Sequence, residues 1–197
     1  MAKRRSSRSA SGVSHHAEIT APDAERSDAL HAQSLVLTPG EGRVIPLGEA
    51  GNVTLKVVSD QTGGTLSAYE FVAPPRTAGP PLHLHRGWDE AFYVLDGEMT
   101  FMIDGQTHTA PAGSFIFIPR GILHTFWNAR ADPARQLVVF TPAAIEAYFD
   151  EVTRVMAAGD EEALDAATAL MERHDMSVPS GTRPAYGALT PDGSPAG

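Results

Sequence analysis

The sequence contains no cysteine among its 197 residues. This absence excludes disulfide scaffolds, thiolate zinc sites, iron–sulfur clusters and cysteine nucleophiles, so any metal must be held by nitrogen and oxygen ligands. Long apolar runs are also lacking, and none approaches the roughly 18 residues that a membrane-spanning helix requires. The basic start of the chain continues into the polar segment Ser6–His16, where a secretory signal would be apolar. We therefore expect a soluble, cytoplasmic protein that does not associate with membranes.

Positive charge is scarce outside the N-terminus. The chain has 15 basic and 24 acidic side chains, and its formal net charge is −9. Four of the basic residues lie within the first eight positions, which leaves a charge of −13 on residues 9–197. An acidic body repels a phosphate backbone, so we expect no nucleic-acid partner.

Turn residues divide the chain into short segments. Residues 1–33 are polar and show no hydrophobic period, so we predict a disordered N-terminal arm. From residue 34 to residue 141, short apolar runs are separated by turn sequences such as Asp96-Gly97 and Asp104-Gly105. Many short strands with no helix between them indicate an all-β fold, either an antiparallel sandwich or a small barrel.

A helical period replaces the strand pattern after Phe140. Thr141 followed by Pro142 is typical of a helix N-terminus, and apolar residues then recur at spacings of three and four. These apolar residues are Ile145, Tyr148, Phe149, Val152 and Met156. A second helix is predicted from an Asp160 cap to about Arg173. We expect residues 142–175 to form two helices packed on the barrel or on a partner, and residues 176–197 to be a flexible tail.

Four residues form a candidate metal site. His83 and His85 are two apart on an extended segment, so their side chains project from the same face. Glu90 follows at the start of the next strand, and His124 lies on a later strand. Three imidazole nitrogens and one carboxylate oxygen suit one divalent first-row transition metal, among Fe, Mn, Ni, Co, Cu and Zn. Glu90 is also the candidate catalytic residue, because it is the carboxylate best placed to act as a general base.

The spacing of these residues resembles the two sequence motifs of the cupin superfamily. The residues that match the first motif are His83, His85, Glu90 and Gly97. Those that match the second are Gly113, Pro119, Gly121, His124 and Asn128. Gly79 lies four residues before His83, closer than the early glycine that is usual in the family. The resemblance implies a small jelly-roll barrel, also called a double-stranded β-helix, with the metal ligands inside it and Asn128 as a hydrogen-bonding residue at a strand end.

The order of the elements, a single cupin barrel and then a helix beginning Thr-Pro, is similar to that of bacterial quercetin 2,3-dioxygenase-type cupins. That resemblance implies a dioxygenase for an aromatic or enolic, flavonol-like small molecule, in which metal-bound substrate reacts with dioxygen. Two alternatives stay open: a non-redox isomerase, cyclase or decarboxylase, and a cupin that binds a small molecule without catalysis. Cupins commonly dimerise through sheet edges or terminal segments, so we expect a homodimer.

Strand parity suggests a substrate pocket. Phe92 shares the face of Glu90, Phe126 shares the face of His124, and Phe101 is expected to point inward as well. Aromatic walls around a metal would suit a hydrophobic small molecule. The same side chains would also fill the interior of any small barrel, so parity leaves both readings open.

Overall fold

The structure is a computed structural model that describes residues 34–143, 145–156, 161–180, 182, 187 and 188. The predicted N-terminal arm at residues 1–33 lies outside these described residues, as does most of the predicted C-terminal tail. Among the described helices, none is both long and apolar enough to cross a membrane.

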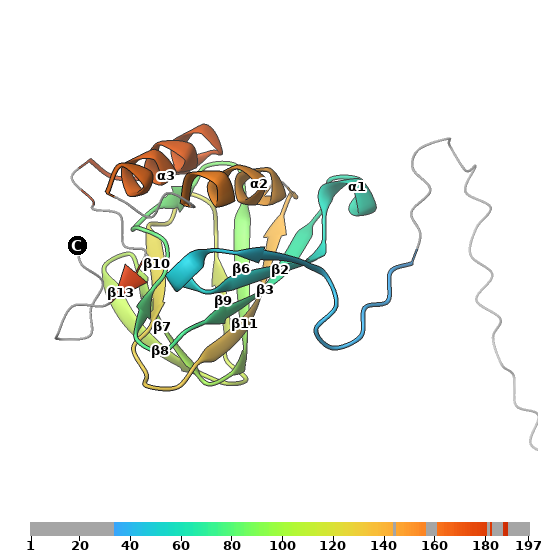
Figure 1. Ribbon diagram of the computed structural model, residues 1–197, viewed down its shortest axis with the longest axis horizontal. Coiled ribbons are helices and arrows are strands. Elements are labelled where there is room, and N and C mark those ends of the chain that lie inside the picture. The colour runs from blue at the N-terminus through green and yellow to red at the C-terminus, as the bar shows by residue number, and fades with distance from the viewer. Residues whose placement is uncertain (1–33, 144, 157–160, 181, 183–186, 189–197) are drawn as a thin grey trace, which may run out of the picture. The chain divides into compact units, whose positions relative to one another are not determined.

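Two antiparallel sheets form the body of the structure (Figure 1). The larger sheet has the strand order β1 (Arg43–Pro46), β2 (Asn52–Val57), β3 (Ser67–Ala73), β11 (Ala134–Thr141), β6 (Asp89–Asp96) and β9 (Phe115–Ile118). The other has the order β13 (Gly187–Ala188), β4 (Thr77–Ala78), β10 (His124–Asn128), β7 (Glu98–Ile103) and β8 (Gln106–Pro111). Together they make a jelly-roll barrel, which confirms the predicted fold class.

The barrel interior is built by strand alternation. In β11, Gln136, Val138 and Phe140 are at most 1% exposed and alternate with half-buried or exposed neighbours. The turn between β6 and β7 needs a glycine, because Gly97 has a φ of 70° and an added Cβ would lie 2.8 Å from the carbonyl oxygen of Pro133. The predicted Asp-Gly turn therefore carries the chain from β6 in the larger sheet to β7 in the other sheet.

Four helical segments complete the described chain: the 3-10 turn η1 (Gly48–Ala50), the short α1 (Ser59–Thr62), α2 (Ile145–Met156) and α3 (Glu161–Arg173). Helices α2 and α3 contact each other and cover one end of the barrel (Figure 1). The predicted stripe of α2 is buried at Ile145, Tyr148, Phe149 and Val152. Each such side chain stabilises the fold by about 1.5–3 kcal/mol relative to an exposed one.

The start of α2 differs from the prediction. Thr141 is the last residue of β11 and not a helix cap, and the helix begins at Ile145. The Thr141 hydroxyl donates a hydrogen bond to the carbonyl oxygen of Thr65, at 3.1 Å. This contact and the strand pairing of Thr141 with Asp89 keep Thr141 in β11, although threonine also favours the N-cap position of a helix.

The segment after α3 also differs from the prediction of a flexible tail from residue 176. Strand β12 (Met176–Ser177) pairs with β5 (Leu84–His85), so that Met176 lies opposite the candidate ligand His85. The carboxylate of Glu172 accepts a hydrogen bond from the Val178 amide, at 2.7 Å. Further along, β13 pairs with β4. A two-residue strand is too short to show an alternating pattern, so sequence could not reveal it.

Candidate metal centre

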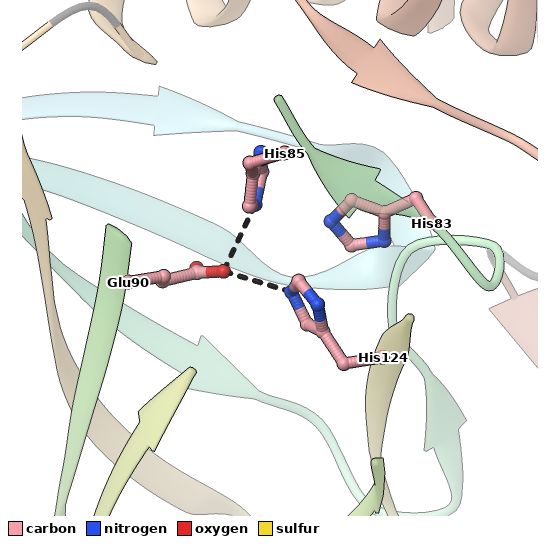
Figure 2. A group of neighbouring side chains, drawn as sticks. All are labelled: His83, His85, Glu90 and His124. Carbon is pink, nitrogen blue, oxygen red and sulfur yellow. Dashed lines mark hydrogen bonds and ion pairs between the residues drawn. The ribbon is translucent and has the colours of Figure 1, made fainter. Parts of the chain in front are cut away.

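The four candidate ligands meet at one end of the barrel interior. Their nearest ligand atoms all lie within 4.8 Å of one another, and each residue is at most 3% exposed. Figure 2 shows the three rings and the carboxylate turned toward a common centre. Backbone hydrogen bonds in both directions between His83 and His124 hold two of the ligands together, at 3.0 and 2.8 Å. The structure thus brings together every residue of the predicted ligand set.

Backbone carbonyls orient two of the histidine rings. Nδ1 of His83 lies 2.8 Å from the carbonyl oxygen of Pro81, and Nδ1 of His124 lies 2.9 Å from that of Ile122. A carbonyl oxygen can only accept, so Nδ1 carries the proton in both rings. The Nε2 lone pairs are therefore free to face the centre of the cluster, the arrangement that is usual for metal-binding histidines.

Glu90 joins the histidines through one oxygen. Its Oε2 lies 3.0 Å from Nε2 of His85 and 2.9 Å from Nε2 of His124. The His124 ring therefore has an acceptor beside each of its nitrogens, whereas a neutral imidazole can donate from only one. A cation held between Nε2 and the carboxylate removes this conflict. The donor set, three nitrogens and one oxygen, fits a divalent transition metal.

The protonation states of the ligands also suit a metal. Burial by itself would raise the pKa of Glu90, but the neighbouring His124 and His85 rings lower that pKa to about 2. Burial, with His124 and His85 alongside, lowers the pKa of His83 well below its usual value. An anionic carboxylate and a neutral imidazole are the forms that coordinate metals.

A cavity of about 60 Å³ opens onto the cluster. The barrel contributes mainly apolar and aromatic walls, and the C-terminal elements supply the opposite side. The lining residues from the C-terminal elements are Ile145, Tyr148, Phe149, Val152, Met171 and Met176. Of the described residues that line the cavity, Glu90 is the only one with a carboxylate, and none is lysine or arginine.

The predicted pocket residues separate into two groups. Phe126 lines the cavity, but Phe92 and Phe101 do not, and both are fully buried. Their rings pack against Phe126, with centroids 5.4 and 5.9 Å away. Strand parity identifies the inward face but not the depth along the barrel, so Phe92 and Phe101 belong to the packed core. The contribution of α2, α3 and β12 was missed, because a helical stripe does not reveal which surface it covers.

Asn128 has a structural role, as the resemblance implied. It is fully buried, and its Nδ2 lies 2.9 Å from the carbonyl oxygen of Pro74 and 2.8 Å from that of Asp132. Its Oδ1 accepts a hydrogen bond from the Arg130 amide, at 2.9 Å. His108, which belongs to neither motif, is exposed on β8.

Comparison with known proteins supports the cupin resemblance. The sequence model of the family described as "Cupin domain" matches residues 69–140. Germin-like protein 1 of Brassica napus is 36% identical over 69 residues, which are 32% of this chain and 33% of that protein. The match therefore spans about a third of the relative's length.

A solved structure shows the same fold. KdgF from Halomonas sp. has a TM-score of 0.52 and 15% identity, covering 58% of this chain and 99% of that one. The polyketide cyclase RemF from Streptomyces resistomycificus has a TM-score of 0.48 and 25% identity, covering 55% of this chain and 80% of that one. The family match spans all four candidate ligands, and the likeness to KdgF extends over nearly the whole of that protein. The segment of the barrel that carries the site thus matches the cupin domain model, and the barrel has the jelly-roll fold.

Proposed function

We propose that this protein is a metal-dependent cupin enzyme that oxidises a small apolar enol or phenol with dioxygen. One observation carries the proposal: three members of the buried cluster of His83, His85, Glu90 and His124 line a cavity whose other walls are almost entirely apolar or aromatic. The resemblance to quercetin dioxygenase-type cupins supports the choice of reaction.

The cavity lining restricts the substrate class. Sugars and phosphate esters need several hydrogen-bonding or cationic partners, and the described lining residues supply few beyond the metal ligands. An apolar molecule with a single hydroxyl matches the walls and places that hydroxyl at the cluster. Such a substrate is the hydrophobic small molecule that the sequence led us to expect.

The cavity volume restricts the substrate size. At about 60 Å³ it is well below the roughly 300–1,000 Å³ of typical ligand pockets. A compact, single-ring molecule is therefore the substrate we favour. A flavonol would require the side chains of α2 that form the far wall to move aside.

The residues of the site have separate tasks in this proposal. A divalent metal held by the three imidazoles and the carboxylate would give the site a net charge near +1 and would stabilise a substrate oxyanion, and the electrons taken up by dioxygen would come from that oxyanion. Glu90 removes the proton from the substrate hydroxyl as a general base. Phe126, Phe149 and Met176 hold the apolar body of the substrate and exclude water.

Oxygen consumption tests the reaction class. We would load the purified protein separately with Fe²⁺, Mn²⁺, Co²⁺, Ni²⁺ and Cu²⁺ and add phenols and enols of increasing size. The proposal predicts substrate-dependent oxygen uptake with at least one metal. Turnover without dioxygen would instead establish a non-redox isomerase, cyclase or decarboxylase, and saturable binding without any turnover would establish a binding protein.

A further inference from the structure

The third histidine of the cluster is held differently from the other two. Nδ1 of His85 is buried, and it has no hydrogen-bond partner in the described part of the chain. His83 and His124 each have a backbone carbonyl at the corresponding atom. Without such a contact, a histidine ring can rotate about its Cβ–Cγ bond and turn Nε2 away from the metal. Glu90 lies 3.0 Å from Nε2 at the other end of the ring, so the Nδ1 side of His85 must be held by something other than a hydrogen bond.

Aromatic rings enclose His85 instead. The Trp88 indole stacks on the imidazole, with centroids 5.3 Å apart and planes 28° from parallel. Phe140 meets the imidazole edge-on, with a centroid distance of 5.5 Å and an angle of 89°. Trp88 and Phe140 also contact each other, at 5.8 Å and 87°. The three rings form a buried group in which neither face nor edge of His85 can turn without displacing a neighbour.

We propose that Trp88 is a positioning residue for the metal ligand His85. Its stacked indole holds the imidazole plane so that Nε2 faces Glu90 and the metal, the task that the carbonyls of Pro81 and Ile122 perform for the other two histidines. This inference rests on the metal centre of the proposed function.

Electrostatics strengthen the same contact when metal is bound. Coordination draws electron density from an imidazole, and the face of an indole carries negative charge. Stacking on Trp88 therefore favours the metal-bound form of His85 over the free form. A leucine at position 88 would occupy much of the space but would provide neither the flat surface nor the negative face.

The turn that carries Trp88 is itself anchored. Trp88 lies three residues after His85, between β5 and β6. The Arg86 amide donates a hydrogen bond to the carbonyl oxygen of Asp175, at 3.2 Å, just before β12. An added Cβ on Gly87 would lie 2.7 Å from Oδ2 of Asp175, so the two segments are in close contact. The chain just before the indole is thus held against the segment that leads into β12.

The chain offers a matched control. Trp127 is its other tryptophan, and it is as buried as Trp88, with 5% against 7% of its surface exposed. Trp127 lies on the ligand-bearing strand β10, but no ring contact among the described residues joins it to a ligand histidine. Replacing either tryptophan by leucine removes a similar amount of buried surface. A difference in metal affinity between the two variants would therefore reflect the positioning role of Trp88.

The experiment is a Co²⁺ titration of the wild-type protein and of Trp88→Leu, Trp88→Phe and Trp127→Leu, each metal-free at the start. We expect the Co²⁺ dissociation constant to rise by about 10–100-fold in Trp88→Leu, the range for removing a contact that orients a ligand. Trp88→Phe keeps a ring and should bind Co²⁺ within a few-fold of the wild type, and Trp127→Leu should match the wild type. The Co²⁺ absorption spectrum should shift in Trp88→Leu alone, because one nitrogen ligand is lost.

Circular dichroism identifies variants that do not fold, and Trp88→Met replaces Trp88→Leu if the latter is unfolded. Wild-type affinity and an unchanged spectrum in the folded ring-free variant would overturn the inference. Equal weakening in Trp127→Leu would overturn it too, because general packing would then account for both losses. Failure of the wild-type protein to bind Co²⁺ is a different result, which would overturn the metal centre of the proposed function together with the inference.

Discussion

Replacing Phe149 by alanine tests whether α2 forms a wall of the cavity. Phe149 is 5% exposed. Its ring packs edge-on against Tyr69, with centroids 5.0 Å apart, and lies tilted against the ring of Tyr148, with centroids 5.6 Å apart. Removing a buried phenylalanine ring destabilises proteins by about 3–5 kcal/mol. The ring also borders the cavity, where it has fewer neighbours to lose, so we expect the lower end of this range, about 3 kcal/mol.

The measurement is urea and thermal unfolding of the metal-free protein, followed by circular dichroism. A loss of about 3 kcal/mol corresponds to a fall in Tm of about 6–12 °C for a chain of this size. Phe115→Ala is the matched control, because Phe115 is 67% exposed on the edge strand β9 and its loss should change stability by less than about 0.5 kcal/mol. Equal effects of the two substitutions would refute the packing of α2 on the barrel.

The same variant tests the substrate wall. Removing the ring enlarges the cavity, so Co²⁺-loaded Phe149→Ala should gain affinity for 2-naphthol relative to phenol by about tenfold, through burial of the second ring. Calorimetric titration of both ligands measures this ratio. A ratio equal to that of the wild-type protein would show that the ligand does not reach α2.

Two further predictions concern charged groups. Glu90→Gln should keep a substantial part of the metal, because three histidines and a nearly isosteric amide oxygen remain. Its turnover should fall by at least about 100-fold, because a general base is removed. Normal turnover with normal metal content would exclude the base role. The hydrogen bond from the Val178 amide, helped by Arg86 and Ser177, lowers the pKa of Glu172. The stability from this contact is therefore present above the ordinary carboxyl pKa and is lost as the pH falls through the lower, folded-state value. Acid titration of unfolding should show a shallower loss in Glu172→Gln, and identical pH profiles would contradict the assignment.

The ligand set could be predicted because its spacing relates directly to strand geometry. His83 and His85 share a face by parity, and this local relation survives folding unchanged. The pairing of His83 with His124 joins distant parts of the sequence. The resemblance to cupin motifs then placed both stretches in the same barrel.

The cavity could not be predicted in the same way, because its walls depend on contacts between distant segments. Parity alone did not distinguish Phe126, at the cavity, from Phe92 and Phe101 beneath it. Nor could it show that Met176, from a two-residue strand, lies opposite His85. Metal identity and the homodimer stay predictions, because neither follows from the residues of a single chain.

Metal content is the most direct test of the central claim. Purified protein analysed by inductively coupled plasma mass spectrometry should contain close to one divalent transition metal per chain. The double variant His83→Ala/His124→Ala should lose nearly all of it, whereas His108→Ala, which removes an exposed histidine outside the cluster, should retain the wild-type amount. Full metal retention by the double variant would contradict the assignment of the metal centre.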